Sequence, residues 1–260
     1  MMKSNFTPQE LLCMALLLQK DKIYGILDSL GTDQQIVIQD TIDRLMEENV
    51  VHMDMDGRVF LDERYYNLVN TISDCSKFLT VQRREGSARG RQIAFWDYAD
   101  RYLMADIFEA QYLFSWADKD TIRGLLDDCV YQGSCSEEAL EIVVPQIQLV
   151  KALRLCQSDR PEEAIRLLRQ NGVPEETAHV ILDGLQRESY FAEMKYAEIS
   201  SDGSAISELS FLASRGYLFS LQKTVLNLRS CTIFLAESQQ EMHRKVSKIA
   251  DAFFAQCLEE

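Results

Sequence analysis

The sequence predicts an α+β protein in which one supersecondary unit occurs twice. Residues 92–130 read as three strands and then a helix, and residues 208–254 read the same way. Both stretches alternate imperfectly between apolar and polar residues and are rich in aromatics, as is typical of antiparallel strands with one packed face. A helical section precedes each of them. We therefore predict two pseudo-symmetric subdomains, each a helical section (the first winged-helix-like) followed by an antiparallel sheet and a closing helix.

The first helical section opens with a clear start signal. Thr7 fits the N-cap, Pro8 the first helical position, and Glu10 completes a capping box. Gly31 is placed to end a short second helix. The predicted helices cover residues 6–18, 22–30 and about 33–49.

Residues 50–61 alternate around Asp56-Gly57 and predict a hairpin, so that residues 6–61 form a winged helix-turn-helix. Such folds usually read DNA with the third helix. That helix carries Arg44 as its only base against five acids, which would repel phosphates. We favour packing or protein contact for this section. The alternative is a winged-helix transcriptional regulator or sensor with a duplicated ligand- or protein-binding region.

The remaining elements follow in order along the chain. Glycine-rich or polar turns separate the strands, and Pro145 lies inside a long predicted helix, which it kinks or divides. A second capping box, Ser238 with Glu241, opens the last helix. Further helices are predicted at 62–73, 118–131, 137–156, 161–170, 174–188 and 238–257. Strands are predicted at 77–84, 91–98, 102–108, 111–116, 190–199, 205–213, 217–222 and 224–235.

The joint between the two halves is predicted at residues 132–136, QGSCS. It divides the chain into an N-terminal subdomain, 1–132, and a C-terminal subdomain, 133–260. A chain of 260 residues can hold two small domains or one large one. We expect the halves to form one compact pseudo-two-fold domain.

The composition narrows the class of partner. The chain has 41 Asp and Glu against 27 Lys and Arg, a net charge of −14, and both halves are acidic. This balance disfavours nucleic acid and anionic membranes. The N-terminus lacks the pattern of an export signal, and no apolar run is long enough to span a bilayer. The seven cysteines have no CxxC spacing and fit reduced thiols, so we expect a cytoplasmic protein.

Catalytic and cofactor motifs are missing from the sequence. It contains no GxSxG, phosphate-binding loop, dinucleotide fingerprint or HExxH. His52, His179 and His243 are far apart and lack ligand spacing. We therefore expect no enzyme activity, metal or cofactor. An enzyme of unmarked chemistry stays open only if a deep pocket with perturbed titratable groups exists.

Two kinds of residue are candidates for contact with a partner. Four arginines surround the predicted EGSARG turn and suit an acidic partner, although they also fit an ordinary solvated turn. The aromatic residues of the strands are mostly expected in the core, but a partly exposed face would bind protein. The partner-binding candidates are Arg83, Arg84, Arg89, Arg91, Phe95, Trp96, Tyr98, Trp116, Phe211, Tyr217 and Phe219.

The order of these elements resembles the EspG-like chaperones of type VII secretion systems, in the branch from Gram-positive bacteria outside the mycobacteria. The resemblance rests on the opening FTPQELLCMALLL, the section ending in DGRVFLDERYYNLV, and the aromatic strands KFLTVQRREG and RQIAFWDYADRYLMADIFEAQYLFSW. It spans nearly the whole chain as a pattern, without a diagnostic motif. No binding residue is carried over from it.

The resemblance implies a pseudo-two-fold α/β fold and a non-enzymatic cytosolic chaperone or adaptor. Such a protein binds a helical secreted substrate and keeps it soluble and export-competent for the secretion ATPase. The substrate would contact the sheet and its loops, which here are Lys77–Trp116 and Tyr190–Leu235. No direct membrane insertion is expected, and the oligomeric state is left open, a homodimer included.

Overall fold

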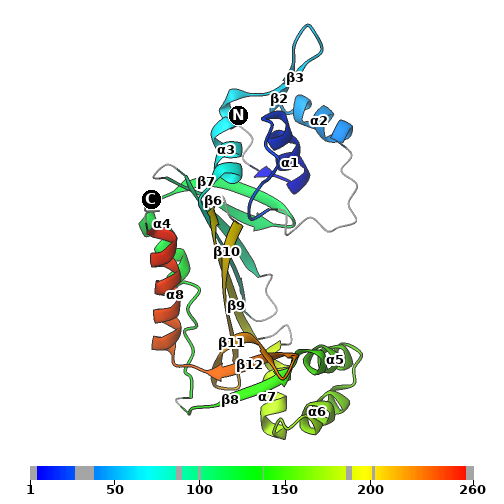
Figure 1. The fold of residues 1–260 in the computed structure, drawn as a ribbon, viewed down its shortest axis with the longest axis vertical. Coiled ribbons are helices and arrows are strands. Elements are labelled where there is room, and N and C mark those ends of the chain that lie inside the picture. The colour runs from blue at the N-terminus through cyan, green and yellow to red at the C-terminus, as the bar shows by residue number, and fades with distance from the viewer. Residues whose placement is uncertain are drawn as a thin grey trace.

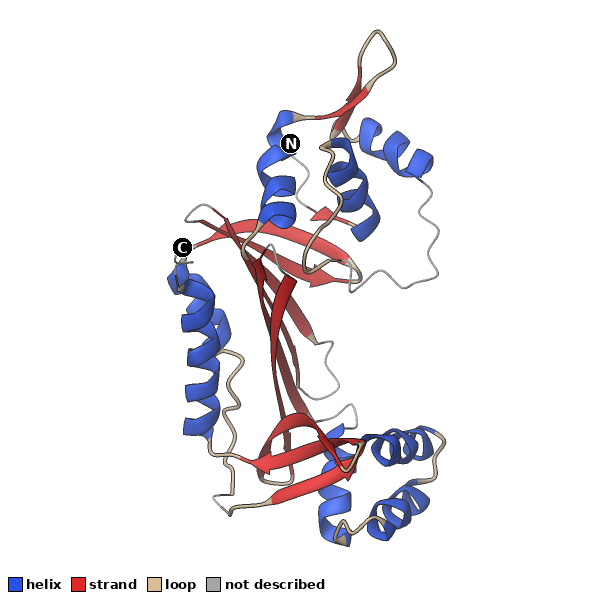
Figure 2. Ribbon diagram, in the orientation of Figure 1, coloured by secondary structure: helices blue, strands red, loops and turns tan. Residues whose placement is uncertain are grey.

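The computed structural model describes residues 5–26, 38–85, 90–98, 101–136, 138–185, 189–200 and 203–255. Its main element is a ten-stranded antiparallel sheet in the order β1-β7-β6-β5-β4-β9-β10-β11-β12-β8 (Figure 1). A separate two-stranded sheet pairs β2 with β3. Helices cover parts of both faces of the large sheet (Figure 2), so the predicted α+β class is confirmed.

The bounds of most predicted strands agree with the structure to within a few residues. The strands of the large sheet are β1 (Asn5–Phe6), β4 (Lys77–Arg84), β5 (Arg91–Tyr98), β6 (Arg101–Phe108), β7 (Gln111–Ala117), β8 (Glu141–Pro145), β9 (Tyr190–Ser200), β10 (Gly203–Ser214), β11 (Tyr217–Leu226) and β12 (Arg229–Ala236). The small sheet consists of β2 (Val51–Met53) and β3 (Val59–Leu61). The helices are α1 (Pro8–Leu17), α2 (Ile38–Glu47), η2 (Glu63–Tyr65), α3 (Tyr66–Asp74), α4 (Lys119–Asp127), α5 (Gln146–Gln157), α6 (Pro161–Gln170), α7 (Glu175–Leu185) and α8 (Gln239–Phe254).

The two halves of the chain meet at the centre of the sheet. There β4 pairs with β9 in antiparallel register, from Lys77↔Glu198 to Arg84↔Phe191. From this pair β5, β6 and β7 follow outward on one side, and β10, β11 and β12 follow on the other. The strand order is thus the same in both directions. An origin by duplication and a boundary near residue 132 stay predictions.

The N-terminal helices form as the sequence indicates, with one correction. Thr7 and Glu10 make the reciprocal capping box of α1, with Glu10 N–H to Thr7 Oγ1 at 3.3 Å and Thr7 N–H to Glu10 Oε2 at 2.7 Å. The predicted helix over residues 22–30 is wrong for residues 22–26, which form a loop and a turn, and its remainder lies outside the described residues. This loop is fixed where the Trp96 indole donates to the Tyr24 carbonyl at 2.8 Å.

One face of the sheet is covered by α4 and α8. Their apolar side chains pack on Leu79, Phe95 and Phe211. Two charged groups tie α8 to this face. Lys77, which is buried, donates to the Ala252 and Ala255 carbonyls at the end of α8, where the helix dipole favours a cation. At the other end of the helix, Lys245 pairs with the buried Glu237.

The described helices on the opposite face lie at its two ends. Cross-strand partners share a face of a sheet, so Trp96, Phe78 and Ala197 lie on one face, and so do Phe191 and Leu212 farther along. The N-terminal helices pack near Trp96, and α5, α6 and α7 pack on Leu212. Figure 1 shows these two groups at opposite ends of an elongated molecule.

The predicted long helix over 137–156 is wrong for residues 138–145 and correct from Gln146 onward. Residues 141–145, Glu-Ile-Val-Val-Pro, form the edge strand β8, and α5 begins directly after Pro145. Pro145 lacks an amide hydrogen, so it suits the end of an edge strand that precedes a helix. The predicted strand break near residue 223 is also wrong. β11 continues to Leu226 and turns at Asn227 and Leu228.

Candidate partner-binding surface

No helix among the described residues covers the part of this face that lies between the two helical groups. Its middle, over β4 and β9, is polar and is formed by Thr80, Gln82, Glu193 and Lys195, which line a small hollow of about 160 Å³. Ile206 of β10, which pairs with Ala197, is 62% exposed, a large fraction for an isoleucine in a sheet, and lines a cavity together with Leu149 of α5.

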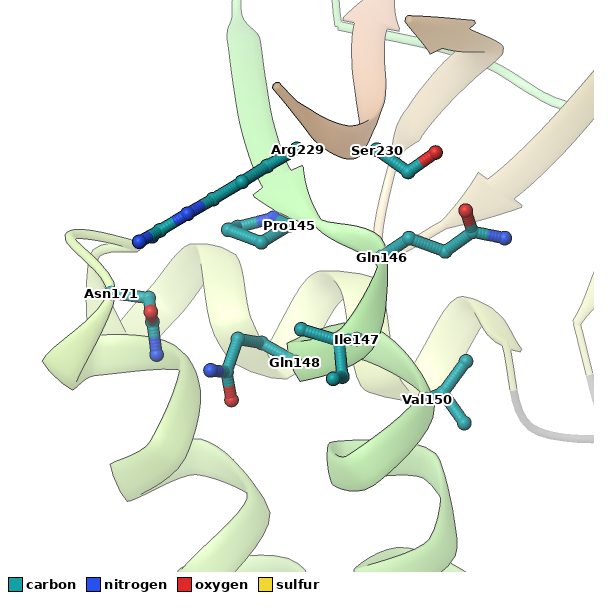
Figure 3. A pocket seen from close by; sticks show the side chains of 8 residues that line it. All are labelled: Pro145, Gln146, Ile147, Gln148, Val150, Asn171, Arg229 and Ser230. Atoms are coloured by element: carbon teal, nitrogen blue, oxygen red, sulfur yellow. The ribbon is translucent and has the colours of Figure 1, made fainter. Parts of the chain in front are cut away.

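A second pocket, of about 690 Å³, lies at the start of α5 (Figure 3). Ile147, which is 63% exposed, and Val150 lie on one side of it. Arg229, at the start of β12, extends across the pocket toward Asn171 (Figure 3). The pocket therefore combines apolar walls with a cation at its rim.

The β11–β12 hairpin adds three more exposed apolar side chains beside this pocket. Val225 pairs with Ser230, and Leu226 with Arg229, so the end of the hairpin is continuous with the pocket wall. Leu228, in the turn, is 99% exposed and has a φ of 61°. We call these five side chains together the α5–hairpin surface. It consists of Ile147, Val150, Val225, Leu226 and Leu228.

The predicted arginine cluster is not gathered into one site. Arg83 donates to the Asp128 carbonyl and pairs with Glu85 at 2.5 Å, on the α4–α8 face. Arg84 lies over the Phe191 ring at 5.7 Å, on the opposite face. Arg91 pairs with Asp106 at 3.1 Å, and Arg89 lies outside the described residues. The three described arginines are therefore engaged within the chain.

The predicted aromatic candidates divide into core and surface. Phe95, Trp96, Phe211 and Phe219 are fully buried, so in the free protein other parts of the chain cover them. Tyr98 and Tyr217 are half-buried, and Tyr217 stacks on Phe219 at 5.6 Å. Trp116 is about half exposed, at the N-terminal end of the molecule. Partner contact through any of these residues stays a prediction.

The residues of the α5–hairpin surface were not among the sequence candidates. Those on α5 were missed because the strand before it was taken for helix. The run Ile142-Val143-Val144 ahead of Pro145 was an available signal, since β-branched residues favour strands and a residue before proline avoids the helical region. No sequence signal marks Leu228 as exposed, because its position depends on the turn.

Two observations concern the metal-ligating and thiol side chains of the described residues. Among them, no three His, Cys, Asp or Glu side chains are grouped so as to hold a metal ion. Burial raises the pKa of Cys75 to about 12 and that of Cys129 to about 11, which keeps both as neutral thiols. Within the same residues, no helix combines the length and apolar character needed to cross a bilayer.

Comparison with solved structures identifies the fold. No protein-family model matches the chain, and no curated protein sequence does. The Mycobacterium tuberculosis type VII secretion system chaperone EspG5, solved in complex with the PE25–PPE41 dimer, matches 97% of this chain and 98% of its own, with a TM-score of 0.56. The fold is similar to that of EspG5. The resemblance predicted from the sequence is thus confirmed for the fold, at a sequence identity of 11% to EspG5.

Proposed function

We propose that the protein is a chaperone or adaptor that binds a helical secreted protein through the α5–hairpin surface. The observation that carries this proposal is that exposed apolar side chains of α5 and of the β11–β12 hairpin lie beside one pocket. Contiguous apolar patches on a soluble protein mark binding sites for other proteins. The fold shared with EspG5, a type VII secretion chaperone, supports the same assignment.

The shape and chemistry of this surface suit an amphipathic helix. Such a helix places its apolar face into a groove through residues spaced three and four apart. Ile147, Val150 and Leu228 would take those anchors, and Arg229 at the rim would pair with an acidic side chain. The net charge of −14 would keep a protein with an apolar patch from self-associating.

Co-expression tests the proposal directly. The protein is produced together with each small helical export candidate encoded near its gene, and the complexes are analysed by size-exclusion chromatography with light scattering. A one-to-one complex is expected with one of them. If the protein elutes alone with every candidate, the proposed function is wrong.

Point variants then locate the contact. Ile147→Asp and Leu228→Asp each place a carboxylate in the surface and are expected to weaken binding by about 30-fold or more, as for hot-spot residues. The matched control is Leu113→Asp, because Leu113 is also half exposed but lies on β7, at the other end of the sheet. Isothermal titration calorimetry gives the affinities. Equal losses in all three variants would contradict the placement of the site.

A further inference from the structure

The ten-stranded sheet is split between β10 and β11. These strands pair only from Ser214↔Tyr217 to Ser210↔Leu221. Beyond that point β10 continues through residues 203–209, paired with β9 alone, and β11 continues through residues 222–226, paired with β12 alone. Two strand edges therefore face each other without pairing, and each presents backbone N–H and C=O groups.

A cavity of about 820 Å³ occupies this split. Its lining comes from both strands, with Ile206 and Leu209 on β10 and Leu221 and Gln222 on β11. It is also lined by Leu149 of α5 on one face of the sheet and by Lys245 of α8 on the other. The split therefore extends from one face to the other and opens beside the α5–hairpin surface.

Among the described contacts, a single ion pair crosses the split. Lys223 Nζ lies 2.7 Å from Glu208 Oε2, and the two residues would be opposite each other if the β10–β11 register continued. Both side chains are exposed, and exposed ion pairs contribute little to stability. The ion pair thus bridges β10 and β11 at a point where the two strands have no backbone pairing. A ligand that enters the split can displace this ion pair at a small cost in free energy.

The charges around the split balance one another. Lys195 lies near Glu193 and Glu208, Lys223 pairs with Glu208, and Lys245 pairs with Glu237, so three bases face three acids. This arrangement favours neither an acidic nor a basic occupant. Unpaired backbone edges on both sides and apolar side chains between them instead fit an uncharged extended chain.

We propose that the split receives an extended, uncharged segment of the partner as an added strand between β10 and β11. The five free residues of β11, at about 3.3 Å each, accommodate a segment of about five residues. Main-chain hydrogen bonds to both edges would hold it, while the helical part of the same partner lies on the neighbouring α5–hairpin surface. The inference therefore rests on the proposed function.

Amide hydrogen exchange of the full chain, free and in the purified complex, tests the added strand. Slower exchange in residues 203–209 and 222–226 on binding is expected, with no change in 91–98, which are paired on both sides already. A complex that forms without slower exchange in the split would overturn the added strand and leave the proposed function standing. Failure to form any complex would overturn both.

Adjacent proline variants provide a second test. Consecutive residues of a strand direct their N–H groups to opposite sides, so one of Ile206→Pro and Ser207→Pro removes a hydrogen bond to β9 and the other removes only an N–H that faces the split. The variant that keeps the wild-type urea midpoint is expected to bind the partner about five- to tenfold more weakly. Unchanged affinity in that variant would contradict strand addition.

Discussion

Leu228 combines two features that rarely coincide in one residue. Its side chain is almost fully exposed, and its φ of 61° lies in the left-handed region that disfavours side chains with a Cβ. Asn227 before it has a φ of 49°, which asparagine tolerates. Glycine would fit the second position of this turn better. A leucine held there at a cost to folding is consistent with contact to a partner.

Leu228→Gly is expected to stabilise the free protein by about 0.5–1 kcal/mol, since relief of left-handed strain outweighs the added freedom of the unfolded chain. Urea unfolding measures the change. The control is Asn227→Gly, for which a shift of only a few tenths of a kcal/mol is expected. Destabilisation by Leu228→Gly would mean that the side chain packs against the free protein after all.

Burial of individual residues was only partly predictable from the sequence. The capping residues Thr7 and Glu10 were predicted because capping is local. Which aromatic side chains are buried could not be predicted, because β5 is covered on both faces. Phe95 packs beneath α4 and α8, while the next residue, Trp96, packs beneath the N-terminal helices. A strand buried on both faces shows no alternation that separates core from surface.

The carboxylate of Asp62 links the hairpin β2–β3 to the helix η2 that follows it. Asp62, directly after β3, lies 2.9 Å from His52 Nε2 of β2 and accepts hydrogen bonds from the Arg64 side chain and from its backbone N–H, at 2.8 and 2.9 Å. The Arg64 side chain is the main cause, and His52 the next, of a pKa for Asp62 far below its ordinary value of 3.8.

The depressed pKa of Asp62 predicts how the stability of the β2–β3 hairpin changes as the pH falls. Because the folded-state pKa of Asp62 is depressed, the carboxylate stabilises the hairpin fully above about pH 4 to 5, and the contribution is lost as the pH falls through the folded-state value. Carbon NMR of the Asp62 carboxyl should give a pKa below 3.8. Arg64→Met should raise it, and Arg58→Met, at the exposed tip of the hairpin, should leave it unchanged. A pKa that does not respond to Arg64→Met would contradict the assigned cause.

At the level of elements, the sequence predicted the strands β4 to β7 and β9 to β12 and missed both edge strands of the sheet, β1 and β8. Strands β4 to β7 alternate and are separated by short turns, so local pattern suffices for them. The strand β8 forms through its partner β12, whose paired residues lie 86 to 94 positions later, from Pro145↔Cys231 to Glu141↔Leu235. A five-residue segment placed by so distant a pairing resembles part of a helix when it is read with its neighbours alone.

The charge of the whole molecule bears on the DNA-binding alternative. In the described part of α2, Arg44 is the only base and pairs with Glu10 of α1 at 3.1 Å. We expect no binding of duplex DNA in fluorescence anisotropy at physiological salt, even at the micromolar concentrations at which non-specific binders are detected. Saturable binding that weakens as salt is raised would instead support the regulator hypothesis.

The pairing of β4 with β9 also sets an order of events during synthesis. The paired residues lie between 107 and 121 positions apart, from Arg84 with Phe191 to Lys77 with Glu198. At about 5–20 residues per second on the ribosome, β4 emerges roughly 5–25 s before the strand that completes it. During that interval the strands β4 to β7 present an unpaired edge along β4, and such an edge favours aggregation until β9 covers it.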